Sequence, residues 1–248
     1  MKRKMKRKKI LVFSGAGVSQ ESGVETFRGL SGGLWNNYDV RKVADIRAWR
    51  EDPQTVIDFY NLRRRDMGKI HPNKAHQIIS ELEKWFDVTV VTQNIDNLHE
   101  LAGSSKVIHL HGEITKLRSD RNRRITQEWI GELELGQLAQ DGSQLRPDVV
   151  WFGEELDSDR IEETKRACKD VDACIIVGTS MQVAPANGIP FLTPETCLLY
   201  YVDPGDKDFY IPTFREYFFY HFQEVASVGM EQVKEDLLST FKINTNEC

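Results

Sequence analysis

Five short apolar segments most constrain what this chain can fold into. They are KILVF at 9–13, VTVVT at 88–92, VIHL at 107–110, ACIIV at 173–177 and CLLYYV at 197–202. Their apolar residues are consecutive rather than alternating with polar ones. This pattern is typical of strands that are buried on both faces of a parallel sheet.

The segments between these runs have the residue spacing of helices. In residues 73–86 the apolar side chains share one helical face, and Asn73 provides an N-cap just after Pro72. Residues 159–169 fit a charged helix, and residues 229–241 fit a closing helix. Strands that alternate with helices predict an α/β fold, in which helices cover both faces of a parallel sheet.

Two longer stretches break the alternation. Residues 29–70 are rich in Trp, Arg and Asp and mostly helical in pattern, whereas residues 113–147 are polar and show no buried-strand pattern. We expect both to be insertions that together form a smaller lobe. The chain is then a single domain over residues 9–248, preceded by a basic tail at 1–8.

Positive charge is concentrated at the N-terminus, where residues 1–9 contain seven Lys or Arg. The remainder has 26 basic against 38 acidic residues, and such an acidic body argues against nucleic-acid partners. A disordered tail, or a start of translation at Met5, is the simpler interpretation of the basic segment; an anionic partner is the alternative. No segment has the apolar length of a signal peptide or membrane helix, so we expect a cytoplasmic protein without membrane partners, compatible with a monomer.

The cysteines are scattered along the chain, at Cys168, Cys174, Cys197 and Cys248. No two of them are separated by two residues, so they cannot build a zinc ribbon. We expect buried or free thiols.

A glycine-rich turn, Gly15-Ala16-Gly17-Val18-Ser19, follows the first predicted strand. Small residues there let the backbone approach a pyrophosphate, and the N–H groups of a following helix point toward it. The usual dinucleotide fingerprint has a third glycine where this chain has Gln20. An ordinary glycine-rich turn therefore remains the alternative on this motif alone.

Polar residues also follow other predicted strands, where ligands bind in open α/β sheets. Residues 92–96 (TQNID) follow one strand and residues 178–180 (GTS) another, although Asn and Asp are also ordinary turn residues. His109 and His111 would point the same way in a strand, and a lone histidine is more often structural than catalytic.

Taken together, the blocks GAGVSQESGVETFRG, TQNID, HLHG, RPDVVWFGE and GTSMQVAPA occur in this order. This combination resembles the sirtuin family from about residue 9 to the C-terminus, and within it the bacterial desuccinylase and deacetylase class (class III). The resemblance implies a Rossmann-like NAD domain with a small lobe and a cleft between them. It also implies NAD-dependent removal of acyl groups from lysine of proteins or peptides, which gives nicotinamide and O-acyl-ADP-ribose.

The resemblance further implies which residues contact NAD. Gln93 would contact the nicotinamide ribose, and Asn94 and Asp96 would hold the nicotinamide end. Asp203 departs from the Asn that is common at its place. The full set is Gly15, Ala16, Gly17, Ser19, Thr26, Phe27, Arg28, Gln93, Asn94, Ile95, Asp96, His111, Gly178, Thr179, Ser180, Asp203 and Ala226.

By the same resemblance, His111 and Asn94 are the catalytic residues. The acyl oxygen of the substrate attacks the ribose carbon as nicotinamide leaves, and His111 then takes a proton from a ribose hydroxyl. An imidazole titrates near neutral pH, which suits a general base. His109 keeps a structural interpretation.

The substrate side is implied by two further segments. Residues 147–153 match an edge to which an acyl-lysine peptide adds as a strand. Val150, Trp151 and Phe152 would form the lysine tunnel, and Gly153 is a further substrate-binding residue of this edge. A core strand with large residues is the alternative. Relatives that prefer succinyl or malonyl lysine carry Tyr-x-x-Arg and an upstream small residue, which here are Tyr60, Arg63 and Ala44. An Arg fork pairs well with a carboxylate; the alternative is a solvated arginine run.

Residues 113–147 depart from the family because they contain none of its zinc-binding cysteines, and Ser119 stands roughly at the first such position. We therefore expect no metal, and a small lobe held by packing and ion pairs. A mono-ADP-ribosyltransferase and an NAD hydrolase or NAD-sensing module remain alternative functions. An inactive binding protein and a conventional dehydrogenase fit the motifs less well.

Overall fold

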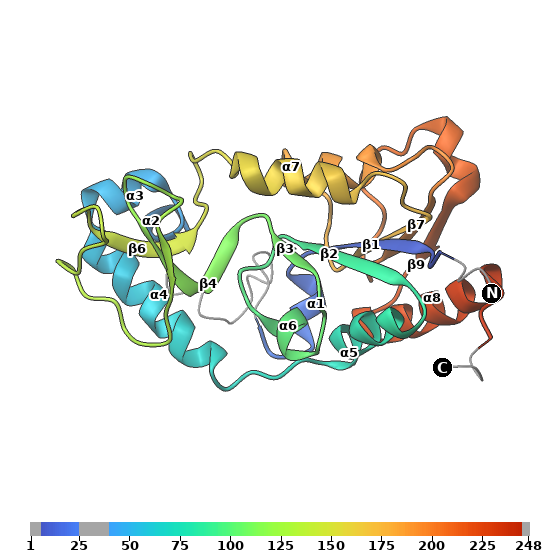
Figure 1. The fold of residues 1–248 in the computed structure, drawn as a ribbon, viewed down its shortest axis with the longest axis horizontal. Helices are drawn as coiled ribbons and strands as arrows, with labels where there is room; N and C mark the ends of the chain where they lie inside the picture. Colours follow the sequence, from blue (N-terminus) through green and yellow to red (C-terminus); the bar gives the residue numbers. More distant parts are fainter. Residues whose placement is uncertain (1–5, 25–39, 245–248) are drawn as a thin grey trace.

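The computed structural model describes residues 6–24 and 40–244, so the predicted NAD contacts Thr26, Phe27 and Arg28 lie outside the described residues. Six parallel strands form the main sheet in the order β3-β2-β1-β7-β8-β9 (Figure 1). They are β1 (Lys9–Ser14), β2 (Asp87–Thr92), β3 (Val107–His109), β7 (Ala173–Val177), β8 (Leu198–Val202) and β9 (Phe219–Phe222). Because β1 lies between β2 and β7, the strand order reverses at β1, which places the ligand-binding switch point at its carboxyl end.

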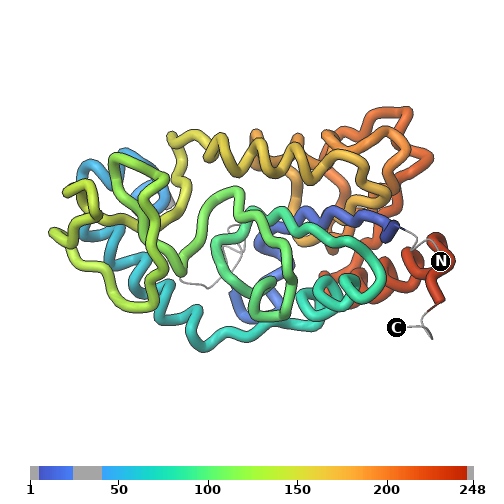
Figure 2. Tube along the Cα trace, viewed as in Figure 1, coloured from blue at the N-terminus to red at the C-terminus, as the bar shows by residue number. Residues whose placement is uncertain are grey.

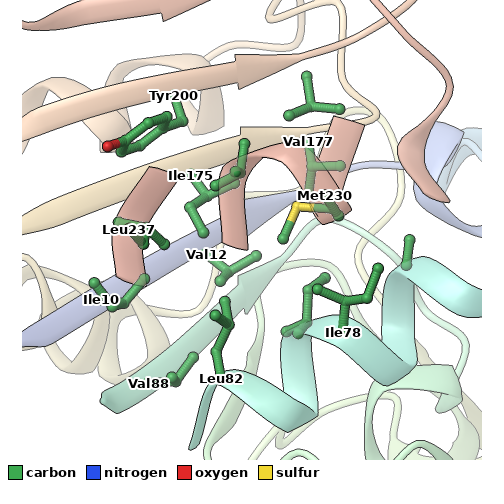
Figure 3. Close-up of a cluster of buried hydrophobic side chains, with 14 of the residues drawn as sticks. Ile10, Val12, Ile78, Leu82, Val88, Ile175, Val177, Tyr200, Met230 and Leu237 are labelled. Atoms are coloured by element: carbon green, nitrogen blue, oxygen red, sulfur yellow. The ribbon is translucent and has the colours of Figure 1, made fainter. Parts of the chain in front are cut away.

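Helices cover both faces of this sheet, which confirms the predicted α/β class. The helices α5 (Lys74–Glu81) and α8 (Ala226–Thr240) pack on one face, and α7 (Ser158–Ala167) lies on the other (Figure 1). Figure 3 shows the first of these cores, where Val12, Ile175 and Tyr200 face the two helices. The alternate residues of each strand, such as Leu11 and Ile176, are buried in the second core. Burial on both sides explains the uninterrupted apolar runs.

Some elements differ from the sequence expectation. The helix predicted over 73–86 ends its α-helical part at Glu81 and continues as the 3₁₀ turn η2 (Leu82–Lys84). The edge strand β9 was not expected, although its sequence, FYHF, is rich in aromatic residues; all four of them are half-buried or exposed. The connections add the short helices α1 (Gly17–Gln20) and α6 (Leu98–Leu101) and the 3₁₀ helices η3 (Ala186–Leu192) and η4 (Thr213–Phe218).

A small lobe, which we define as residues 40–67 and 112–149, lies beside the main sheet. Its helices are α2 (Val40–Val43), α3 (Ile46–Glu51) and α4 (Pro53–Met67), and its strands are β4 (Gly112–Ser119), β5 (Thr126–Glu128) and β6 (Leu145–Val149). The strands form an antiparallel sheet in the order β5-β4-β6. Figure 2 shows how these two chain segments, distant in sequence, come together at one end of the molecule.

The expectation that residues 113–147 lack a buried strand was wrong, because every residue of β6 is buried even though its sequence is LRPDV. Arg146 is only 1% exposed, and both of its Nη atoms bind Glu154, at 2.9 and 2.8 Å. Arg118 of β4 binds the same carboxylate at 2.9 Å, and the Arg146 guanidinium lies 3.4 Å from the Trp151 ring centroid. Paired charges therefore fill core positions that a hydropathy pattern assigns to the surface.

Among the described residues, no helix has both the length and the apolar character needed to cross a membrane.

Candidate active site

The glycine-rich turn after β1 packs directly against the turn after β7. Gly15 N–H donates to the Val177 carbonyl at 3.1 Å, and Gly17 N–H donates to the Gly178 carbonyl at 2.8 Å. Gly178 has φ +62°, and a Cβ there would lie 2.2 Å from the backbone nitrogen of Val18. Only glycine fits this contact, which joins two of the predicted NAD segments at the switch point.

Asn94 and Asp96 meet the same turn through Ser19. The Asn94 Nδ2 donates to the Gly15 carbonyl at 3.2 Å and to Ser19 Oγ at 3.1 Å, and Ser19 Oγ donates to Asp96 Oδ2 at 3.0 Å. Burial raises the pKa of Asp96, against the effect of hydrogen bonds from Leu98 N–H and Ser19. The structure therefore brings three predicted site residues into one buried polar cluster.

Gln93 provides a polar group that the protein leaves unused. Its Oε1 accepts a hydrogen bond from Thr179 Oγ1 at 3.1 Å, whereas its Nε2 is buried and has no partner among the described residues. A buried donor without a partner is costly unless a ligand satisfies it. Together with the close glycine turns, this unsatisfied donor fits a dinucleotide bound across the carboxyl ends of β1, β2 and β7.

Three further predicted NAD contacts, Ser180, Asp203 and Ala226, are less closely connected to this cluster. Asp203 follows β8 and is half-buried; its side chain accepts a hydrogen bond from Gly205 N–H at 2.9 Å, and burial raises its pKa. Ala226 begins α8, where Ser227 N–H and Oγ both donate to Glu21, at 2.8 and 2.6 Å. Ser180 is half-buried, directly after Thr179.

His109 and His111 bind consecutive carbonyls of the turn after β2. His111 Nδ1 lies 2.9 Å from the Gln93 carbonyl, and His109 Nδ1 lies 2.9 Å from the Asn94 carbonyl. Burial lowers the pKa of His111, which favours the neutral ring at neutral pH. With its proton on Nδ1, His111 keeps a lone pair on Nε2, for which no partner is present among the described residues.

A polar layer below this turn was missed by sequence reasoning. His99 Nε2 lies 2.9 Å from Ser14 Oγ, and Ser14 Oγ donates to Thr92 Oγ1 at 2.9 Å. Thr92 Oγ1 in turn accepts the Asn94 N–H at 3.0 Å. The available signal was that Ser14 and Thr92 are the polar last residues of two buried strands.

The substrate candidates cluster where the small lobe meets His111. Val150 N–H donates to the His111 carbonyl at 2.8 Å, and Trp151 is 2% exposed beneath Arg146. Trp151 Nε1 donates to Tyr60 Oη at 2.8 Å, and Ala44 belongs to the same buried cluster. Burial raises the pKa of Tyr60 to about 12, so its hydroxyl stays protonated. Arg63 is half-buried on α4, one turn from Tyr60.

The peptide edge has one feature that the sequence did not indicate. The Phe152 N–H donates to the Ala44 carbonyl at 2.9 Å, and the Phe152 carbonyl accepts the Ile46 N–H at 3.0 Å. Its side chain is 50% exposed, and the following Gly153 has φ +82°. A peptide that adds as a strand therefore has to pair with backbone groups other than those of Phe152.

Ser119, which the sequence comparison placed roughly at the family's first zinc-binding cysteine, lies in a hydrogen-bonded cluster. Ser119 Oγ donates to Asp141 Oδ2 at 2.6 Å, lies 2.7 Å from Ser143 Oγ, and accepts the backbone N–H groups of Arg121 and Asn122. Two hydroxyls and one carboxylate, already bonded to one another, do not fit the thiolate and imidazole ligands of structural zinc. In the part of the chain that the structure describes, no group of three or more His, Cys, Asp or Glu side chains is arranged to hold a metal ion.

Known proteins are similar to this chain in sequence. Residues 15–185 match the family model described as the Sir2 family. An NAD-dependent protein deacylase of Helicobacter pylori strain J99 is 47% identical over 205 residues, which cover 83% of this chain and 86% of that protein. An NAD-dependent protein deacylase of Bacteroides thetaiotaomicron is 42% identical, with 93% of this chain and 98% of that protein covered.

Solved structures agree with the sequence relatives. The crystal structure of a Sir2 homolog–NAD complex superposes with a TM-score of 0.80 at 33% identity, covering 95% of this chain and 91% of that one. A mutant Sir2 homologue in complex with ADP ribose gives a TM-score of 0.82 at 32% identity, covering 96% and 95%. The resemblance drawn from the five sequence blocks is thus confirmed, and this chain belongs to the Sir2 family.

Proposed function

We propose that this protein is an NAD-dependent protein lysine deacylase that favours acyl groups ending in a carboxylate. The observation that carries the activity is the arrangement of His111, whose Nδ1 faces the Gln93 carbonyl while Nε2 is left for a substrate proton. The names of the Helicobacter and Bacteroides relatives, both NAD-dependent protein deacylases, support the reaction class.

NAD, when bound, supplies an electrophilic ribose carbon from which nicotinamide departs. His111 is the general base: its neutral ring accepts a proton at Nε2, and the Gln93 carbonyl stabilises the imidazolium through Nδ1–H. Buried sites of this kind strengthen such a hydrogen bond because the local dielectric is low.

Asn94 and Asp96 orient the nicotinamide end. Their side chains are both fixed by Ser19 Oγ, so neither can rotate without breaking a buried hydrogen bond. The unpaired Nε2 of Gln93 offers a donor to the adjacent ribose. Val150, bonded through its N–H to the His111 carbonyl, sets the lysine tunnel of Val150, Trp151 and Phe152 at a fixed position relative to the base.

The preference for an acyl carboxylate rests on Tyr60 and Arg63. Because Trp151 Nε1–H already donates to Tyr60 Oη, the Tyr60 O–H proton is available for a substrate acceptor. The Arg63 charge acts on the Tyr60 hydroxyl, so both groups are near the same space. A phenol donor with a guanidinium matches a succinyl or malonyl carboxylate, and the small Ala44 leaves room for it.

The test is to incubate the purified protein with matched acetyl-lysine and succinyl-lysine peptides, with and without NAD, and to follow peptides and nicotinamide by mass spectrometry. We expect NAD-dependent loss of succinyl faster than of acetyl, and a decrease of about 100-fold or more for His111→Ala. ADP-ribose attached to protein would indicate a mono-ADP-ribosyltransferase instead. Nicotinamide release without any change in the peptide would indicate an NAD hydrolase.

Arg63→Met tests the acyl preference in the same assay. We expect kcat/KM for the succinyl peptide to fall roughly 10- to 100-fold, while that for the acetyl peptide changes little, because only the former loses a charge-assisted hydrogen bond. Arg65→Met is the matched control, since Arg65 lies on the same helix but is exposed and paired with Glu132. Equal losses for both peptides would refute the carboxylate pocket and leave the deacylase class intact.

A further inference from the structure

We infer that His109 is a positively charged positioning residue, held in that state by Glu100, which fixes the turn that carries Asn94 and Asp96. The inference rests on the proposed function, because that function places the nicotinamide end of NAD at this turn. It assigns a second, distinct role within the His-Leu-His-Gly block, since His111 acts as a neutral base.

The contacts of the His109 ring require two protons. Nδ1 lies 2.9 Å from the Asn94 carbonyl oxygen, and Nε2 lies 2.8 Å from Glu100 Oε1. A carbonyl oxygen and a carboxylate oxygen only accept hydrogen bonds, so each ring nitrogen must donate. A neutral ring carries one N–H and would leave one of these contacts between two acceptors.

The surroundings keep the ring charged. Burial opposes the charge on a ring that is 5% exposed, but the hydrogen bond and charge of Glu100 and the Asn94 carbonyl outweigh it, and the pKa of His109 is raised. Burial acts against the Glu100 carboxylate too, yet its bond to His109 leaves the pKa of Glu100 lowered. Charged or titratable groups near this pair are His99, Asp96, Glu113, Lys116 and Arg160.

The charge has a consequence for Asp96. Burial raises the pKa of Asp96, and the positive charge of His109 lowers it. Without that charge the folded-state pKa of Asp96 rises further, so the carboxylate is lost at a higher pH. His109 thus acts on the nicotinamide site in two ways: Nδ1–H fixes the Asn94 carbonyl, and the charge opposes the protonation of Asp96.

Three variants separate geometry from charge. His109→Ala removes the donor and the charge. His109→Asn places an amide N–H where Nδ1 was, so it keeps the donor to the Asn94 carbonyl and loses the charge together with the contact to Glu100. Glu100→Gln keeps an amide at hydrogen-bond distance from Nε2 but removes the counter-charge, and Glu113→Gln removes a nearby carboxylate that does not contact the ring.

Ring protonation is measured first, by ¹⁵N–¹H correlation spectra of the histidines in the substrate-free protein. We expect His109 to be doubly protonated at pH 7 in the wild type and in Glu113→Gln, and to become neutral near that pH in Glu100→Gln. A neutral His109 ring in the wild type at pH 7 overturns the inference. This measurement does not depend on catalysis, so its outcome tests the inference independently of whether the protein is a deacylase.

The functional readout is the pH profile of NAD binding by calorimetry, and of kcat/KM for NAD. For His109→Asn we expect the acidic limb of both profiles to move to higher pH, on the order of half a unit. At pH 8.5 this variant should recover most of the NAD affinity that His109→Ala loses, and at pH 6 it should not. Profiles of His109→Asn that coincide with the wild type would show that the charge has no role.

Discussion

The carboxyl edge of the main sheet and the small lobe are stabilised in opposite ways. At the sheet edge, backbone groups contact backbone groups, as where Gly17 N–H meets the Gly178 carbonyl with no room for a side chain. In the small lobe, side chains provide the stability, through the Arg146–Glu154 pair and the Ser119–Asp141–Ser143 cluster. A backbone turn that is packed this closely can accept few other residues. A lobe that is held by side-chain interactions can instead be stabilised by several different sets of side chains.

Gly178→Ala tests the close backbone contact at the carboxyl edge of the main sheet and should have the largest effect. The substitution places a Cβ 2.2 Å from Val18 N at a φ of +62°, so we expect loss of NAD binding and a decrease of about 3 kcal/mol in the free energy of unfolding. Calorimetry with NAD and urea denaturation measure the two quantities. Gly188→Ala is the control, because nothing lies within 4 Å of its added Cβ; if both variants bind NAD alike, the close approach is not required.

Glu154→Gln tests the charged core of the small lobe. It removes the carboxylate that both Nη atoms of Arg146 bind and leaves that guanidinium, which is 1% exposed, with only Asp120 at 3.7 Å. We expect a loss of about 2 kcal/mol in unfolding free energy. NAD affinity should change little, while KM for the peptide should rise, because Trp151 N–H also binds this carboxylate at 2.9 Å. An equal loss of NAD affinity would show that the two regions are not energetically separate.

Ser119→Ala tests the hydrogen-bonded cluster that we expect to replace a structural metal in the small lobe. Removing a fully buried hydroxyl that joins four groups should cost about 1 to 2 kcal/mol in unfolding free energy. Addition of a strong chelator should leave the melting temperature of the wild type unchanged. A chelator-dependent decrease in melting temperature would contradict the replacement.

The Ser119–Asp141–Ser143 cluster also predicts that stability depends on pH, which should be the smallest of these effects. Hydrogen bonds from Ser119 and Ser143 lower the pKa of Asp141 in the folded state. A carboxyl with a lowered folded-state pKa stabilises the fold above its unfolded pKa, and this stabilisation is lost as the pH falls through the folded value. The difference in melting temperature between the wild type and Ser119→Ala should therefore narrow below about pH 4; a constant difference down to pH 2 would contradict the assigned role of Asp141.

The amino-acid sequence by itself determined the α/β class, the family and the positions of the glycine-rich and polar turns that follow β1, β2 and β7. Runs such as ACIIV have only one stable environment, burial on both faces of a sheet. The geometry of a motif such as Gly15–Ser19 is determined by its own residues, through the conformations open to glycine and the start of the helix that follows. The strand β6, whose sequence LRPDV contains charges and a proline, lacked such a local signal.

Only the tertiary structure decided the charge states and the partners of the polar residues. Ser119 meets Asp141 and Ser143, which follow it by 22 and 24 residues, and His111 and His109 meet carbonyls 18 and 15 residues before them. The sequence alone does not show whether a histidine ring faces one hydrogen-bond acceptor or two. Its protonation depends on burial and on distant neighbours, so the fold, not the motif, lowers the pKa of His111 and raises the pKa of His109.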